Sequence, residues 1–293
     1  MKEPIFNYHT HTYRCGHASD AKDEEYVVAA INLGLKRLGF SDHIPPMPGI
    51  VHNPIGRMAP NQKDDYLNSI KNLKEKYIDE IEIIVGWEAE YDERLLPFLL
   101  TSKNEVDFMI LGAHSTHSGM KIFERGKPLE YAKNICDAIK SGLYDIVAHP
   151  DTFMLQRDKA EDETKFLEEA KEASLLICKT AKAYNVPLEI NFNGILNSRG
   201  KTYPDGELGY PHSLFWNTAK EVGTLVILGI DAHSPCRFDA FYDSLALINK
   251  TINLKDLNFV DDNYQSVIAR SNNHKLREAL TNIRNNVFSK ESP

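Results

Sequence analysis

Long apolar runs are absent from this sequence of 293 residues. Its apolar segments are short, LVILGI being among the longest, whereas a transmembrane helix needs about 20 apolar residues. The first residues, MKEPIFNYHTH, contain no apolar stretch of the kind that a secretory signal requires. We therefore expect no membrane partner and a cytoplasmic location.

Cysteine is also scarce, and the 42 acidic residues outnumber the 34 lysines and arginines. The formal net charge of −8 argues against nucleic acid as a partner, because proteins bind its backbone through a basic surface. A small anionic substrate is still compatible with this charge, since bound metal ions can make a site locally positive. The cysteines form no CxxC pair, which favours reduced thiols. They are Cys15, Cys136, Cys178 and Cys236.

Linkers and low-complexity segments are lacking as well. The hydrophobic content of 42% is enough for one large core in a chain of this length. We predict a single domain over residues 1–293, in which residues 238–293 form a partly helical C-terminal extension. The sequence leaves the oligomeric state open.

What the sequence does contain is a repeated layout. A short apolar run, typical of a buried strand, is followed directly by polar residues that can bind metals. Segments with helical periodicity lie between these runs, as in Asp23–Leu33, whose apolar residues share one face. The seven apolar runs are Ile5–Tyr8, Leu35–Phe40, Ile81–Val85, Phe108–Leu111, Tyr144–Ala148, Pro187–Phe192 and Thr224–Ile230.

Strands that alternate with helices predict βαβ units and a parallel sheet. Right-handed crossovers place the carboxyl ends of all strands on one side of the sheet. In a closed barrel these ends form the mouth in which active sites lie. Seven strands favour an α/β fold with a distorted TIM-like barrel, and an open doubly wound sheet is the alternative.

Histidines and acids gather at the predicted strand ends. His9 and His11 are two residues apart on a strand, so their side chains share a face and can chelate zinc, manganese or iron. One such pair could equally be two unrelated polar residues, but its repetition at other strand ends favours a site for several metals. The other candidate ligands are His17, His43, Glu88, His114, His149, Asp231 and His233.

Five motifs carry a resemblance to a known family. They are HTHT at 9–12, GWE at 86–88, GAH at 112–114, AHPD at 148–151 and GIDAHS at 229–234. In this order they resemble the polymerase and histidinol phosphatase (PHP) family, and its histidinol-phosphatase branch in particular. The resemblance implies a distorted (β/α)7 barrel that holds two or three divalent metal ions, with zinc, manganese and iron as candidates.

The resemblance also implies a ligand set for each metal. Glu90 is a rival to Glu88, but the family's glutamate directly follows a Gly-x pair, as Glu88 does. The first metal would take His9, His11, Glu88 and Asp231; the second Glu88, His114 and His149; the third His17, His43 and His233.

The activity implied is that of a phosphoric monoester hydrolase, with L-histidinol phosphate of histidine biosynthesis as the leading substrate. Metal ions lower the pKa of bound water, and Asp231 could orient that nucleophile and shuttle a proton, or serve as a ligand only. Arg157 and Arg199 follow strand-end motifs and are expected to bind phosphate, although each could be a surface salt bridge. The alternatives are another phosphoester, such as a nucleotide or phosphotyrosine, and a non-catalytic metal-binding regulatory module.

Overall fold

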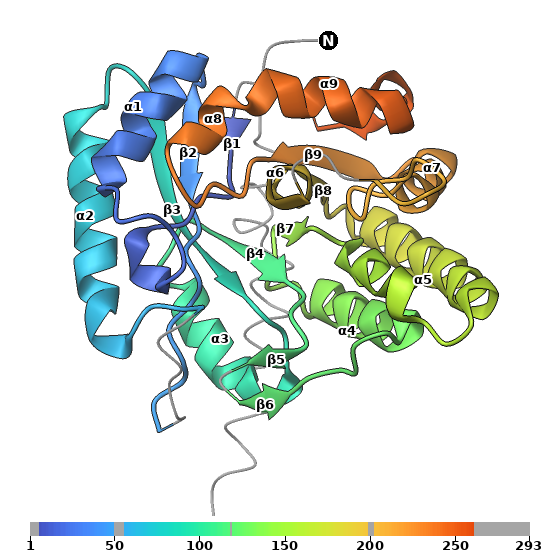
Figure 1. Cartoon of the computed structure of the whole chain (residues 1–293). Coiled ribbons are helices and arrows are strands. Elements are labelled where there is room, and N and C mark those ends of the chain that lie inside the picture. Colours follow the sequence, from blue (N-terminus) through green and yellow to red (C-terminus); the bar gives the residue numbers. More distant parts are fainter. Residues whose placement is uncertain (1–5, 50–55, 118, 199–201, 261–293) are drawn as a thin grey trace, which may run out of the picture.

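The computed structural model describes residues 6–49, 56–117, 119–198 and 202–260. Its main sheet is entirely parallel, with the strand order β1-β2-β3-β4-β7-β8-β9-β10. Figure 1 shows this sheet curled in the centre of the molecule, with helices around its outside. The strands are β1 (Phe6–Asn7), β2 (Arg37–Phe40), β3 (Glu82–Ala89), β4 (Phe108–Gly112), β7 (Ile146–Ala148), β8 (Leu188–Asn191), β9 (Leu225–Gly229) and β10 (Asn258–Phe259).

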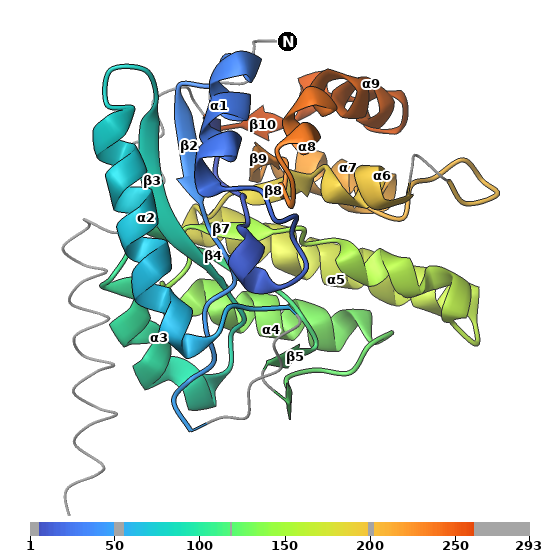
Figure 2. The same cartoon turned by 60° about the vertical axis from the view of Figure 1, so that its left-hand side comes forward.

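Helices follow most of the strands, as the alternating pattern predicts. In Figure 2, α4 and α5 lie side by side on one flank of the sheet, and α1 and α2 cover another. Among the described residues, no helix is both long and apolar enough to cross a bilayer. The helices are α1 (Asp23–Leu33), α2 (Lys63–Lys76), α3 (Leu96–Lys103), α4 (Pro128–Ser141), α5 (Glu163–Tyr184), α6 (Asn193–Ser198), α7 (Ser213–Val222), α8 (Cys236–Asp239) and α9 (Phe241–Thr251).

Helix ends coincide with local signals in the sequence. Asp162 caps the start of α5 by accepting a hydrogen bond from the backbone N–H of Lys165 at 3.0 Å. Gly142 and Gly223 end α4 and α7 in the left-handed conformation that glycine adopts most readily. These caps fix where each chain segment turns back toward the sheet.

All seven predicted strands are present, and the curled sheet closes at one end. The segments that follow β1 and β9 pair with each other through Thr10 and Ala232. The backbone N–H of His11 donates to Ala232 O at 2.9 Å, and the N–H of Ala232 donates to His9 O at 3.1 Å. Closure therefore falls on the two motifs that the sequence marks as metal-binding, as a distorted TIM-like barrel requires.

An eighth strand, β10, was not predicted. It pairs with the start of β9, where Phe259 lies opposite Val226. It therefore adds a strand beside β9 at the end of the barrel away from the histidine motifs. It belongs to the segment 238–293 that the sequence describes as partly helical, in which α9 is also found. Residues 261–293 lie outside the described part of the chain.

The inside of the barrel, at the end away from the histidine motifs, is filled by apolar side chains. We call this cluster the floor of the barrel, and the cluster of polar residues at the carboxyl ends of the strands its mouth. The floor is separate from the larger core between helices and sheet. It consists of Tyr8, Ile84, Phe108, Ile110, Ile146, Ala148, Ile227 and Val260, with Phe6 and Leu225 packed against it.

Candidate metal centre

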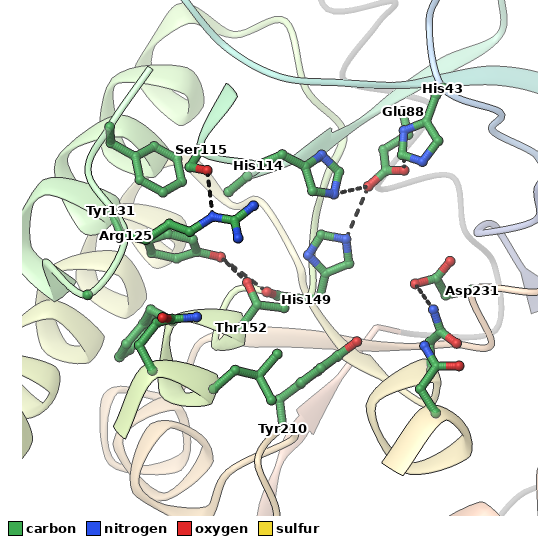
Figure 3. A pocket seen from close by; sticks show the side chains of 18 of the residues that line it. His43, Glu88, His114, Ser115, Arg125, Tyr131, His149, Thr152, Tyr210 and Asp231 are labelled. Carbon is green, nitrogen blue, oxygen red and sulfur yellow. Dashed lines mark hydrogen bonds and ion pairs between the residues drawn. The ribbon is translucent and has the colours of Figure 1, made fainter. Parts of the chain in front are cut away.

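The mouth of the barrel gathers all nine predicted ligands. His9 and His11 follow β1, His43 follows β2, and Glu88 lies near the end of β3. The other ligands come from strand ends further along the chain and from the segment after β1. A cavity of about 550 Å³ opens over them, and Figure 3 shows five of the predicted ligands facing it. The ligands that line it are His11, His17, His43, Glu88, His114, His149, Asp231 and His233.

His9 and His11 face each other at the bottom of this cluster. Their Nε2 atoms are 3.1 Å apart. The Asp231 carboxylate lies 3.4 Å from His9 Nε2 and 3.1 Å from His11 Nε2, and Glu88 lies 3.5 Å from both. Four potential ligand atoms thus converge on one point, in the first of the combinations that the family resemblance implies.

The other ring nitrogen of each of these histidines faces a second carboxylate. Glu189 accepts a hydrogen bond from His9 Nδ1 at 2.9 Å, and Asp42 faces His11 Nδ1 at 3.5 Å. Because an ionised carboxylate only accepts, His9 Nδ1 must carry the proton, which leaves a lone pair on Nε2 when the ring is neutral. A buried carboxylate behind a histidine is the usual arrangement around a bound metal.

The pKa values of His9 and His11 reflect the excess of negative charge in this cluster. Burial disfavours the charged form of His9, yet the carboxylates of Asp231 and Glu189 outweigh burial and raise its pKa well above the ordinary value. The pKa of His11 is raised in the same way, mainly by Asp231. A buried group of acids that draws protons onto its histidines is a group that divalent cations can neutralise. The residues present therefore fit metal ions.

Glu88 lies between the two sides of the mouth. Its carboxylate is 3.1 Å from His43 Nδ1, 3.1 Å from His149 Nε2 and 3.9 Å from His114 Nε2. Burial alone would raise the pKa of Glu88, but His43 and His9 lower it well below its ordinary value. An ionised carboxylate with histidines on both sides could serve as a ligand to metal ions on either side.

Glu90, the rival to Glu88 in the sequence, has a different role. It accepts hydrogen bonds from His114 Nδ1 at 3.0 Å and His117 Nδ1 at 2.7 Å, and it pairs with the buried Arg57 at 2.7 Å. The carboxylate is therefore occupied from behind the mouth, and it orients His114 with Nε2 toward Glu88. This geometry agrees with the choice of Glu88 as the central acid.

The third predicted set lies on the outer side of the mouth. His233 Nε2 is 2.8 Å from His17 Nε2. Ligand atoms of His11, His43 and His233 all lie within 4.8 Å of one another, and the same holds for Cys15, His17 and His233. His233 is therefore common to two candidate groups, and one of these also includes the buried thiol of Cys15.

Asp231 presents one oxygen to the mouth and has the other fixed behind it. Its Oδ2 accepts hydrogen bonds from Asn191 Nδ2 at 3.2 Å and from Asn193 Nδ2 at 3.1 Å. Its Oδ1 is buried and faces His11 Nε2 at 3.1 Å and His233 Nδ1 at 3.2 Å. The φ angles of Asp231 and His149 are +52° and +32°, unusual values for residues other than glycine. Such backbone strain often marks functional sites.

Of the two arginines predicted to bind phosphate, the structure describes only Arg157. Arg157 pairs with Glu163 at 2.8 Å and with Asp205 at 2.6 Å, and its guanidinium lies 5.0 Å from the centre of the Tyr203 ring. It is absent from the described lining of the cavity, and Arg199 lies outside the described residues. The phosphate-binding role of both arginines stays a prediction.

The sequence patterns did not predict that three carboxylates, those of Glu189, Asp42 and Glu90, face the Nδ1 atoms of candidate ligands. Glu189 is a lone acid within the apolar run Pro187–Phe192, and Asp42 directly precedes His43. An acid inside a buried strand needs a partner in the barrel, and this signal could have singled out Glu189. No pattern in the sequence says which histidine it holds.

Fold and site together define an α/β barrel protein with a histidine–carboxylate cluster of metal-binding composition at its mouth. The model of the PHP domain family matches residues 7–193. The chain belongs to the PHP family, as its motifs indicate.

Relatives in sequence agree with this assignment. A protein of Thermoanaerobacter sp. strain X514, named a probable phosphatase, is 27% identical over 256 residues, which cover 86% of this chain and 89% of that protein. A protein of Deinococcus radiodurans, named a probable histidinol-phosphatase, is 26% identical over 242 residues, which cover 78% of this chain and 85% of that protein. These relatives are aligned over nearly their whole length.

Solved structures share the fold. The HisK protein of Listeria monocytogenes superimposes with a TM-score of 0.65 at 21% identity, over 82% of this chain and 99% of that protein. The histidinol phosphate phosphatase of Lactococcus lactis, solved with zinc, L-histidinol and phosphate, gives a TM-score of 0.61 at 18% identity, over 87% and 95%. At these identities the likeness establishes the barrel architecture.

Proposed function

We propose that this PHP-family chain is a metal-dependent phosphatase that hydrolyses a small phosphomonoester. The observation that carries the proposal is the pair of facing Nε2 atoms of His9 and His11, 3.1 Å apart, with Glu88 and Asp231 beside them. Two or three divalent ions of zinc, manganese or iron would be held by the nine residues His9, His11, His17, His43, Glu88, His114, His149, Asp231 and His233.

Bound divalent ions would lower the pKa of water and neutralise the charge of a phosphoester. The chain's own part is to place the groups around that chemistry. Glu189 and Glu90 fix the orientation of His9 and His114, so that Nε2 of each ring is turned to the mouth. This pre-set geometry means that little reorganisation is needed when substrate arrives.

Asp231 is our candidate for the catalytic carboxylate. Asn191 and Asn193 hold its Oδ2, so its Oδ1, which lies 3.1 Å from His11 Nε2 and 3.2 Å from His233 Nδ1, has a fixed direction toward the mouth. Burial opposes ionisation, but His9 and His233 lower the pKa of Asp231 well below the ordinary value. An ionised, oriented oxygen can accept a hydrogen bond from a water molecule and direct its attack.

L-Histidinol phosphate is the leading substrate. It is supported by the probable histidinol-phosphatase of D. radiodurans and by the L-histidinol and phosphate bound in the L. lactis enzyme. Another small phosphoester is the second candidate, because Arg125, Lys127 and Arg237 line the same cavity. Apart from the proposed metal ligands Glu88 and Asp231, Glu124 is the one acid among the described lining residues, so three cations outnumber the acids left for the ammonium group of histidinol.

The test is an assay of the full chain loaded in turn with Zn²⁺, Mn²⁺ and Fe²⁺. The panel would contain L-histidinol phosphate, a nucleoside monophosphate, phosphotyrosine and p-nitrophenyl phosphate, with metal content measured by mass spectrometry. We expect turnover that requires metal and falls at least about a hundredfold in Asp231→Asn. Turnover of other esters but not of histidinol phosphate would remove that substrate. Full metal loading with no turnover of any ester would favour a non-catalytic regulatory module.

A further inference from the structure

Arg125 lines the cavity from a loop that the sequence motifs do not mark. The loop connects the hairpin of β5 (Thr116–His117) and β6 (Met120–Lys121) to α4. The hairpin folds the loop back, since the backbone N–H of Ile122 donates to Ser115 O at 2.9 Å. Arg125 Nε then donates to the Ser115 hydroxyl at 3.0 Å. Its guanidinium is thereby tied to the residue next to His114.

The direction of this side chain is visible in Figure 3, where the guanidinium of Arg125 extends from Ser115 into the space beside His114 and His149. The Tyr131 hydroxyl donates to His149 O at 3.2 Å, which ties α4 to the same ligand segment. A cation is thus held on the cavity side of two proposed metal ligands.

Among the described residues Arg125 forms no ion pair with an acid, unlike three other arginines around the barrel. Arg14 is neutralised by Asp23 and Asp65, Arg57 by Glu90, and Arg157 by two acids of its own. Arg125 is anchored through Nε by a neutral hydroxyl, and among the described residues neither of its Nη atoms has an acceptor. Its positive charge is therefore available for an anion in the cavity.

We propose that Arg125 binds the phosphoryl group of the substrate, with its two Nη atoms donating to two phosphate oxygens. The proposal rests on the proposed function and assigns its phosphate-binding residue. A guanidinium forms two parallel hydrogen bonds to phosphate, which fixes orientation as well as charge. Bound metals would face the phosphoryl group from one side and Arg125 from the other, so the Ser115 anchor sets the angle at which the ester lies.

The experiment measures orthophosphate binding to the metal-loaded full chain by calorimetry, for wild type and for Arg125→Gln. Loss of a charge-assisted pair of hydrogen bonds predicts a dissociation constant about 10–100-fold higher. Arg125→Lys keeps the charge but not the fork and is expected to lie between. The matched control is Arg37→Gln, which removes an arginine that pairs with Glu82 at the start of β3, away from the mouth and from the β5–β6 hairpin. Metal content and thermal unfolding of every variant should equal those of wild type.

Three results would overturn the assignment: phosphate binding by Arg125→Gln within twofold of wild type, no phosphate binding by the metal-loaded wild type, or a loss confined to Arg157→Gln. Steady-state kinetics with any ester that is turned over give a second readout, since loss of Arg125 should raise KM together with the inhibition constant of phosphate. Phosphate binding that depends on Arg125, without hydrolysis of any ester, would refute the proposed function and leave this assignment standing.

Discussion

The two ends of the barrel interior are built from the same strands but with opposite chemistry. At the floor, Phe108 and Ile110 of β4 pack with Tyr8 and Ile227, all nearly inaccessible to solvent. A few residues further along the same segment, His114 stands in the mouth among charged groups. Apolar burial at the floor stabilises the folded state. The mouth concentrates buried charges that oppose folding unless they are paired.

Glycines show that each end needs space of its own. A Cβ atom on Gly86 would lie 2.5 Å from the Phe108 ring, so the absence of a side chain makes room for a floor residue. A Cβ atom on Gly229 would lie 1.8 Å from the Glu189 carboxylate, and one on Gly112 would lie 2.3 Å from that of Glu88. The absence of a Cβ atom therefore makes room for an aromatic ring at the floor and for acidic side chains at the mouth. We expect changes at the floor to alter stability and changes at the mouth to alter metal binding.

The largest effect should come from Phe108→Ala. Phe108 is fully buried and its ring lies edge-on to Tyr8 with centroids 5.8 Å apart. Removing the ring leaves a cavity in the floor, and the free energy of unfolding should fall by about 3–5 kcal/mol. Urea denaturation of the metal-free protein measures this loss.

If Phe108→Ala also weakened metal binding, floor and mouth would not be independent. We expect the folded variant to take up Zn²⁺ with the affinity of wild type. A metal affinity that fell along with stability would show that floor and mouth are a single cooperative unit.

The second effect is on metal affinity, through Glu189→Gln. A neutral amide is a weaker acceptor for His9 Nδ1 than the carboxylate, so His9 loses its fixed orientation and part of its basicity. Zn²⁺ affinity should fall about 10–100-fold in a competition titration with a chelating dye. Glu82→Gln is the control, because that glutamate is half-exposed at the start of β3 and pairs with Arg37. Equal losses in both variants would contradict a specific role for Glu189.

The fold was largely predictable because apolar runs and helical segments alternate along the whole chain. β10 was missed because it has two residues, Asn258 and Phe259, and a strand that short produces no periodic pattern. The edge of the sheet at β9 supplies the pairing, and Val260 reaches the floor from there. Tertiary context rather than local sequence makes this strand.

The convergence of the candidate ligands at the mouth was equally predictable, because parallel strands bring their carboxyl ends together whatever the loops do. The positions of the carboxylates behind these ligands, and of the arginine at the cavity, could not be predicted from the sequence. Glu189 and Glu90 act through contacts between different strands, which no local pattern records. Arg125 reaches the cavity only because the β5–β6 hairpin folds its loop back onto Ser115. Arg157, by contrast, follows a strand-end motif in sequence, yet its guanidinium is held by acids outside the cavity lining.

The smallest effects should come from a matched pair, Gly86→Ala and Gly229→Ala, which add one methyl group at each end of the barrel. At Gly86 the methyl group meets Phe108, and crowding of the floor should lower the free energy of unfolding by about 1–3 kcal/mol without changing Zn²⁺ affinity. At Gly229 it meets the Glu189 oxygen that accepts from His9 Nδ1, so this carboxylate must shift and its hydrogen bond to His9 is disturbed. Because the acid is displaced rather than removed, Zn²⁺ affinity should fall less than in Glu189→Gln. Both variants would be studied by urea denaturation of the metal-free protein and by the dye titration. If floor and mouth are independent, Gly86→Ala should lose mainly stability and Gly229→Ala mainly Zn²⁺ affinity. Parallel losses in both measurements would mean that strand positions, and not the two groups of side chains, govern both properties.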